Sequence, residues 1–87
     1  MKVLKRSGEL QDFDFGKLEA SIARASDDVK EPFTMSDVEN ISHGVLKRLM
    51  SMDKEVIGSN EISEAVLSEL QKNNFTDLAQ TYINDKI

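Results

Sequence analysis

The 87-residue chain has the length of one domain, and its content of 39% hydrophobic and 31% charged residues is ordinary for a globular protein. It has no cysteine, which excludes disulfide bonds, thiolate catalysis and cysteine-based zinc sites. No apolar run approaches the roughly 20 residues that span a bilayer, and the N-terminus lacks the apolar stretch of a signal peptide. We therefore expect one domain over residues 1–87, cytoplasmic and without a membrane partner.

The net charge of −5 argues against direct binding of nucleic acid, which normally requires a net basic face. The distribution of charge is uneven. The first eight residues contain Lys2, Lys5 and Arg6 and no acid, whereas the rest of the chain is predominantly acidic. A small positive patch on a negative protein suits a compact polyanion, such as a nucleoside triphosphate, better than a long one.

The N-terminal segment predicts a β-hairpin. Residues 2–6 and 9–13 are expected as two short strands around Ser7-Gly8, a dipeptide suited to a tight turn. Because side chains alternate along a strand, Lys5 and Arg6 are expected on opposite faces, with Val3 on the same face as Lys5.

Two amphipathic helices are predicted next. Asp14 is expected to cap the first, which ends in the polar segment 27–32. Its apolar residues recur at helical spacing: Phe15, Leu18, Ile22 and Ala25. Thr34 and Asp37 predict a capping box that opens the second helix. We assign to the core face of that helix Met35, Val38, Ile41, Val45, Leu46, Leu49 and Met50.

The second half of the chain predicts two more helices. Val56-Ile57 are compatible with a short third strand, and Ser59 is a plausible cap for the third helix, which Asn73-Asn74 ends. The apolar positions of these two helices are Ile62, Val66, Leu70, Phe75, Leu78, Ala79, Tyr82 and Ile83. The expected fold class is α+β and mostly helical, with an N-terminal β-hairpin capping a four-helix bundle.

Familiar catalytic and phosphate-binding motifs are absent. The four glycines form neither a Walker A loop nor a dinucleotide-binding fingerprint, so side-chain cations would have to hold any phosphates. The candidate is Val3-x-Lys5-Arg6-x-Gly8, although a surface Lys-Arg pair is most often simply solvated. His43 is the only histidine and has no partner for a catalytic dyad or a metal site. We therefore expect neither an enzyme nor a protein-bound metal.

Five segments of the chain form one combined pattern: Val3-x-Lys5-Arg6-x-Gly8, Phe13-Asp14-x-x-Lys17-Leu18, Ile22-x-x-Ala25, Ile57-x-Ser59-x-x-Ile62-x-x-x-Val66 and Ala79-x-x-Tyr82-Ile83. In combination, these segments resemble the ATP-cone, an allosteric nucleotide-binding domain of ribonucleotide reductases. They extend over residues 2–83 in the order and at the spacing of the family. ATP-cones are a β-element over a four-helix bundle, in agreement with the elements predicted above.

The resemblance implies a non-catalytic regulatory module that binds ATP or dATP, with ADP also possible for the family, and Mg²⁺ accompanying the nucleotide. The implied partners are the nucleotide, a second copy of the chain or a ribonucleotide reductase. The family also occurs in a transcriptional repressor of reductase genes, joined to a cysteine-based zinc ribbon that this chain lacks. We expect either a free-standing cone or a domain of a larger protein. The alternative is a helical interaction domain with the cone fold that has lost nucleotide binding.

The resemblance also implies roles for individual residues. Lys5 and Arg6 would contact phosphates, and Lys17 would reach the ribose or the phosphates. The adenine would lie against Val3, Phe13, Leu18 and Ile62. Its polar edge would be recognised by Gln11 and Asp14, while Ser59 and Ser63 would border the sugar and phosphates.

Three positions depart from the common family pattern. Aspartate is frequent where this chain has Ser7, some reductase cones have histidine at Ser63, and glutamate is frequent at Gln11, which leaves base selectivity open. Lys86 is a candidate for a further cation. The last helix, with Tyr82 and Ile83, is a candidate contact surface, with burial in the core as the alternative.

Overall fold

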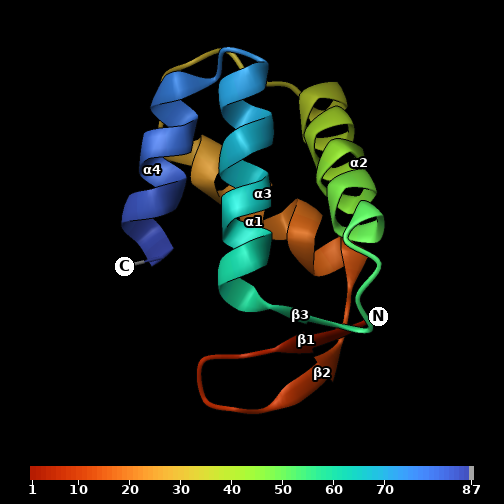
Figure 1. Ribbon diagram of the computed structural model, residues 1–87. Coiled ribbons are helices and arrows are strands. Elements are labelled where there is room, and N and C mark those ends of the chain that lie inside the picture. Colours follow the sequence, from red (N-terminus) through yellow and green to blue (C-terminus); the bar gives the residue numbers. More distant parts are fainter. Residues whose placement is uncertain (87) are drawn as a thin grey trace.

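The chain begins with two strands of a small three-stranded sheet, which the computed structural model places at one end of the molecule (Figure 1). The structure describes the backbone of residues 1–86 and the side chains of residues 1–83. Strands β1 (Lys2–Leu4) and β2 (Leu10–Asp12) pair antiparallel. Strand β3 (Val56–Gly58) pairs parallel with β1, which gives the order β2-β1-β3. The third strand is therefore real, and β1 is the central strand.

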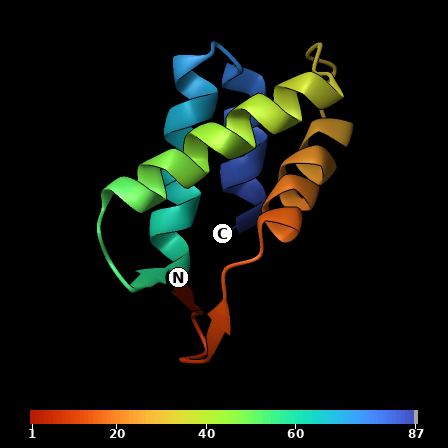
Figure 2. The same cartoon turned by 90° about the vertical axis from the view of Figure 1, so that its right-hand side faces the viewer.

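Four helices stand above this sheet: α1 (Phe15–Asp27), α2 (Met35–Ser51), α3 (Ser59–Lys72) and α4 (Thr76–Lys86). Seen from the first side, α2, α3 and α4 are upright in front and α1 lies behind them (Figure 1). The perpendicular view shows α2 crossing obliquely over the bundle, with the sheet below it (Figure 2). The predicted fold class is confirmed. Among the helices of residues 1–86, none is sufficiently long and apolar for a membrane span.

Local sequence explains where the helices begin. The Asp14 carboxylate accepts a hydrogen bond from the Lys17 backbone N–H at 3.1 Å, as expected of an N-cap. At the start of α2, Thr34 and Asp37 form the predicted reciprocal capping box. The predicted cap of α3 is wrong by one residue. Gly58 is the N-cap, and its backbone N–H donates to the Glu61 carboxylate at 3.0 Å.

The hairpin strands are shorter than predicted. The Lys5 backbone N–H donates to the carbonyl of Glu9 at 2.9 Å, and the Gly8 N–H donates to the carbonyl of Lys5 at 2.9 Å. Gly8 has a φ of +88°, a conformation that favours glycine. The turn therefore starts at Lys5, and the strict alternation of side chains does not extend to Arg6.

The core lies between the helices and the inner face of the sheet. Its largest fully buried apolar side chains are Ile22, Ile41, Val45, Leu49, Ile57, Val66, Leu70 and Leu78. The assignment of Met35 and Met50 to the core is wrong, because their exposed fractions are 70% and 68%. Both lie at the edges of the apolar stripe of α2, where a rotation of a few tens of degrees separates core from solvent.

Helices α2 and α3 meet around a buried carboxylate. Glu69 of α3 is buried, and its carboxylate accepts a hydrogen bond from the Arg48 Nε at 2.6 Å. On α2, a Cβ atom at Gly44 would lie only 2.6 Å from a Glu69 carboxylate oxygen. The glycine therefore makes room for the carboxylate, and the ion pair supplies its charged partner.

We predict that Arg48→Met destabilises the protein by about 1–3 kcal/mol, because it leaves a buried carboxylate without its charged partner. Glu69→Gln should be milder, since the Arg48 side chain is 41% exposed and can be hydrated, whereas that of Glu69 is 9% exposed. Urea unfolding measures both changes. Lys47→Met, on an exposed neighbour in α2, is the control and should shift stability by no more than about 0.5 kcal/mol. Equal losses for Arg48→Met and Lys47→Met would contradict a stabilising role of the pair.

Candidate functional site

A cavity of about 850 Å³ lies where the N-terminal hairpin meets α1, α3 and α4. Its size is within the range of small-molecule and cofactor sites. The hairpin contributes Val3, Lys5, Arg6, Ser7, Gln11, Asp12 and Phe13. Helix α1 and its cap contribute Asp14, Lys17, Leu18 and Ser21. The other two helices contribute Ser59, Asn60, Ile62, Ser63, Glu64, Leu67, Tyr82 and Ile83.

All eleven residues that the resemblance implied for a nucleotide site line this one cavity: Val3, Lys5, Arg6, Gln11, Phe13, Asp14, Lys17, Leu18, Ser59, Ile62 and Ser63. They come from two segments of the chain, 3–18 and 59–63, which the parallel pairing of β1 with β3 brings together. The expectation that Lys5 and Arg6 lie on opposite faces fails here, because the turn that starts at Lys5 lets both cations line the same cavity.

The apolar part of the cavity is continuous with the core. Leu18 is buried, and Phe13, Ile62 and Leu67 are partly buried against the core cluster. Val3 faces this side because it pairs in register with the fully buried Ile57. Such a wall can accept one face of a flat aromatic ring, since it removes apolar surface from water.

Among the described side chains of residues 1–83, three cations and three carboxylates line the cavity. The cations are Lys5, Arg6 and Lys17, all exposed to solvent. Two carboxylates already have partners within the fold. The Asp12 carboxylate forms an ion pair with the Lys2 Nζ at 2.5 Å, and the Asp14 carboxylate caps α1. The hydrogen bond and the positive charge of Lys2 hold the pKa of Asp12 below its usual value. The third carboxylate, Glu64, lies exposed on α3.

Hydroxyl groups line the part of the cavity between α1, α3 and α4. The Ser21 and Tyr82 hydroxyls are 3.4 Å apart and link α1 to α4. Burial raises the pKa of Tyr82, so its hydroxyl is protonated at neutral pH. The Ser63 hydroxyl donates to the Ser59 carbonyl at 3.2 Å and keeps its lone pairs for a ligand donor. Ser59 and Asn60 form the first turn of α3, whose N–H groups are not satisfied within the helix.

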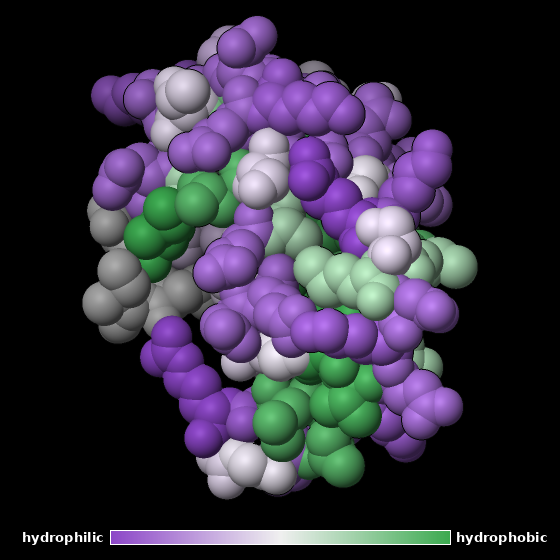
Figure 3. Space-filling model, in the orientation of Figure 1, coloured by the Kyte–Doolittle hydropathy of each residue, from purple (hydrophilic) through white to green (hydrophobic). Residues whose placement is uncertain are grey.

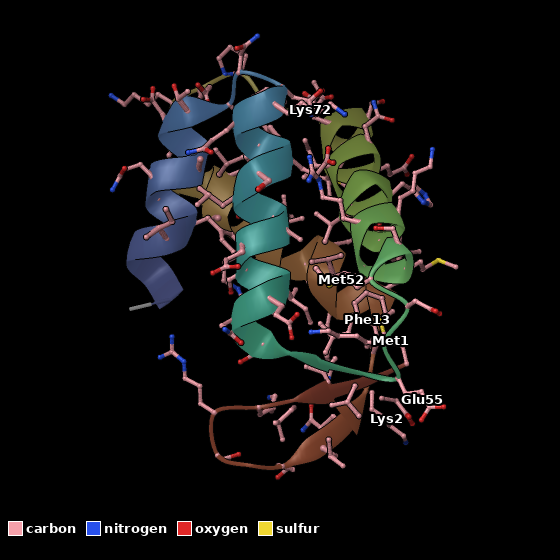
Figure 4. The ribbon with its side chains drawn as sticks, in the orientation of Figure 1. Met1, Lys2, Phe13, Met52, Glu55 and Lys72 are labelled. Carbon is pink, nitrogen blue, oxygen red and sulfur yellow. The ribbon has the colours of Figure 1, made fainter. Side chains whose placement is uncertain are left out.

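The backbone ties the start of the hairpin to the loop before β3. The Lys2 N–H donates to the carbonyl of Glu55 at 2.8 Å, and the Phe13 N–H donates to the carbonyl of Met1 at 3.0 Å. Figure 4 shows these four residues together where the sheet meets the lower end of α2. This end of the hairpin is fixed, and the turn at its other end lies below the lower ends of α3 and α4 (Figure 1).

The outer face of the sheet carries three exposed apolar residues beside the Lys2–Asp12 ion pair. Leu4, Leu10 and Val56 are exposed there, and Figure 3 shows the hydrophobic surface over the strands. These residues alternate with the inward-facing Val3 and Ile57, as the pleat of a strand requires.

The sequence reasoning missed several residues of the cavity. Ser21 and Leu67 could have been found, because each lies one helical turn beyond a predicted site residue, Leu18 and Ser63 respectively. Tyr82 and Ile83 were expected at a contact surface or in the core. Tyr82 is buried, both residues line the cavity, and the contact-surface hypothesis fails for Tyr82. The Lys86 side chain lies outside the described residues.

Curated relatives with similar sequences are transcriptional repressors named NrdR. The chain is 36% identical over 70 residues to the repressor of Roseobacter denitrificans, with 80% of this chain and 44% of the relative covered. Identity to the repressor of Dinoroseobacter shibae is 37% with the same coverage. The repressor of Kosmotoga olearia is 30% identical, with 80% of this chain and 43% of the relative covered. The matched segment of the chain thus spans less than half the length of these relatives.

These relatives overturn the expectation that no nucleic acid is involved, because a transcriptional repressor acts at DNA. The expectation rested on the net charge of −5. The charge sum of this chain does not limit the charge of the parts of the relatives that lie outside the matched segment. It therefore could not exclude nucleic acid as a partner of the family.

The model of the ATP cone domain matches residues 1–84, almost the full length of the chain. The match includes every strand, most of α4 and all the residues that line the cavity. It confirms the resemblance found in the sequence. The chain belongs to the ATP-cone domain family.

Proposed function

We propose that this chain binds an adenine nucleoside triphosphate, ATP or dATP, in the cavity between the hairpin and helices α1, α3 and α4, and that it acts as a non-catalytic regulatory module. The observation that carries the proposal is the arrangement of the cavity. Exposed cations lie at the hairpin turn, and an apolar wall continues into the core.

The charges of the cavity fit a triphosphate. Lys5, Arg6 and Lys17 approach it from two elements, and hydrogen bonds between such cations and phosphate oxygens are about twice as strong as neutral ones. Asp12 is paired with Lys2, and Asp14 accepts a hydrogen bond from the backbone at the start of α1. These two carboxylates therefore repel a bound polyanion less than unpaired carboxylates would. The first turn of α3 adds N–H groups suited to an anion. Mg²⁺ would be carried by the phosphates, because within residues 1–83 no cluster of three or more potential ligands is arranged for a metal.

The two adjacent cations of the turn provide the most direct test. We predict that Lys5→Ala and Arg6→Ala each weaken ATP affinity by about 1.5–3 kcal/mol, the value of a hydrogen bond to a charged group, and leave the fold intact. Calorimetric titration measures the affinity, and circular dichroism checks the fold. Lys47→Ala, which removes a lysine of α2 outside the cavity, is the matched control for net charge. ATP binding of parental strength in both turn variants would refute the phosphate site.

Thermal unfolding distinguishes this proposal from the alternative of an interaction domain that has lost its ligand. A nucleotide present at 100 times its dissociation constant stabilises the folded protein by about 2.7 kcal/mol. An interaction domain without the ligand site would unfold at the same temperature with and without ATP.

We further predict no ATP hydrolysis above the buffer rate. Phosphoryl transfer requires an oriented nucleophile and an anchored metal ion. In the cavity, Asp12 is paired with Lys2, Asp14 caps α1, and Glu64 lies exposed on α3. Phosphate release from a pure preparation measures turnover. Turnover that disappears in Lys5→Ala would show a catalytic site and contradict the regulatory assignment.

The regulatory output that we propose is a change in assembly with itself or with a partner such as a ribonucleotide reductase. A ligand in this cavity contacts the hairpin, α1, α3 and α4 at once, and it shifts an equilibrium only by binding one state more tightly than another. Similarity to transcriptional repressors makes transcription of target genes a second proposed output.

We predict that ATP or dATP changes the molar mass of the protein in solution. Sedimentation and light scattering measure the mass without nucleotide, with ATP and with dATP. An identical mass under all three conditions, in samples where calorimetry shows binding, would contradict self-association as the output.

A further inference from the structure

The side chain of Gln11 is the uncharged amide that β2 contributes to the cavity. Gln11 pairs in register with Val3, so both side chains face the helices, and Gln11 is half-buried. Its Nε2 donates a hydrogen bond to the Glu9 carboxylate at 2.6 Å. Glu9 is two residues earlier on the same strand face, is exposed, and is not a cavity residue itself.

The Glu9 carboxylate decides which way the amide of Gln11 points. An ionised carboxylate only accepts hydrogen bonds, whereas an amide has a donor end and an acceptor end. Rotation of the amide by 180° would place its oxygen against the carboxylate oxygen and lose the bond. The observed orientation directs the carbonyl oxygen of Gln11 away from Glu9 and leaves the second N–H of Nε2 beside it.

The backbone keeps Glu9 in place for this contact. Its carbonyl accepts from the Lys5 N–H at 2.9 Å, and the turn is closed by Gly8 in a conformation that favours glycine. Glu9 thus lies at the junction of the turn and β2, where its backbone is fixed and its side chain lies alongside that of Gln11.

We propose that Glu9 is a positioning residue that orients the Gln11 amide and thereby makes the cavity select 6-aminopurine over 6-oxopurine nucleotides. The inference rests on the proposed function. An amide that offers an acceptor beside a donor matches the N6 amino group of adenine and its neighbouring ring nitrogen. Hypoxanthine and guanine carry an oxygen at position 6, which would face the Gln11 oxygen and lose that bond.

Glu9 also has a purely electrostatic effect that must be separated from this role. It lies opposite Lys5 in the hairpin and adds negative charge near the proposed phosphate site. Its removal would strengthen the binding of every triphosphate by a similar factor. The ratio of two dissociation constants cancels that factor, because ATP and ITP carry the same phosphates.

The experiment is calorimetric titration of the full chain with ATP and with ITP, which differs from ATP at position 6 and in protonation of N1. We expect the parental protein to bind ATP at least about tenfold more tightly than ITP. Glu9→Ala should lower this ratio at least about threefold. Glu9→Gln should lower it as well, because an amide at position 9 can accept from or donate to Gln11 and no longer fixes its orientation. In a Gln11→Glu background, where the side chain at position 11 only accepts, Glu9→Ala should leave the ratio unchanged.

The side-chain amide of Gln11 gives a second measurement that needs no nucleotide. In the free protein, Glu9→Ala should move the NMR signal of the bonded Nε2 proton upfield, and Glu9→Gln should move it less. Circular dichroism confirms that each variant is folded.

Each outcome bears on the inference. An ATP-to-ITP ratio that is the same in the parental protein and Glu9→Ala overturns the positioning role, even if both affinities change together. A parental protein that binds ATP and ITP equally overturns the selectivity while leaving the nucleotide site intact. A protein that binds neither nucleotide refutes the proposed function, and the selectivity with it, whereas the NMR shift still reports whether Glu9 orients Gln11.

Discussion

The parallel pairing of β1 with β3 is the contact on which the cavity depends. It joins Val3, near the N-terminus, to Ile57, which follows α2 and is fully buried. Helix α3 starts immediately after β3, so the same pairing brings its first turn beside the hairpin. A hairpin alone would be marginally stable in water, and burial of its inner face against the helices holds it in place. Without this pairing, the cations of the turn and the apolar residues of α3 would not share a site.

The chain combines a negative overall charge with a cavity at which we propose that an anion binds. Local pairing reduces the negative charge at the cavity. Lys2 forms an ion pair with Asp12, and the backbone at the start of α1 donates a hydrogen bond to Asp14. The positive charges of Lys5, Arg6 and Lys17 at the cavity are therefore less offset by these two carboxylates. The average charge therefore describes the behaviour of the chain at long range, while a triphosphate would respond to the few groups within a Debye length of about 10 Å.

Membership of the ATP-cone family supports the proposal that the cavity binds a nucleotide. The curated relatives are repressors of transcription more than twice as long as the matched segment. A nucleotide in a cavity formed by four elements can change their relative positions, which is how a small domain could influence a larger assembly. The link between α1 and α4 through Ser21 and Tyr82 is part of the cavity wall and would experience such a change.

The sequence by itself determined the elements and much of the candidate site. Asp14, Thr34 and Asp37 act within one helical turn, so their caps could be predicted from local spacing. The resemblance placed eleven residues in one site, and the structure gathers all eleven around one cavity. Binding by these residues stays a prediction.

Tertiary structure decided what local patterns could not. Met35 and Met50 lie at the edges of an apolar stripe, and only the packing angle of α2 turned them to solvent. Position 44 has no room for a Cβ atom, because the close approach of α2 and α3 brings the Glu69 carboxylate against it. Tyr82 reached the cavity through the docking of α4. Each of these outcomes depends on contacts between residues far apart in the chain, whose geometry is set when the helices pack and not by the spacing of residues along any one of them.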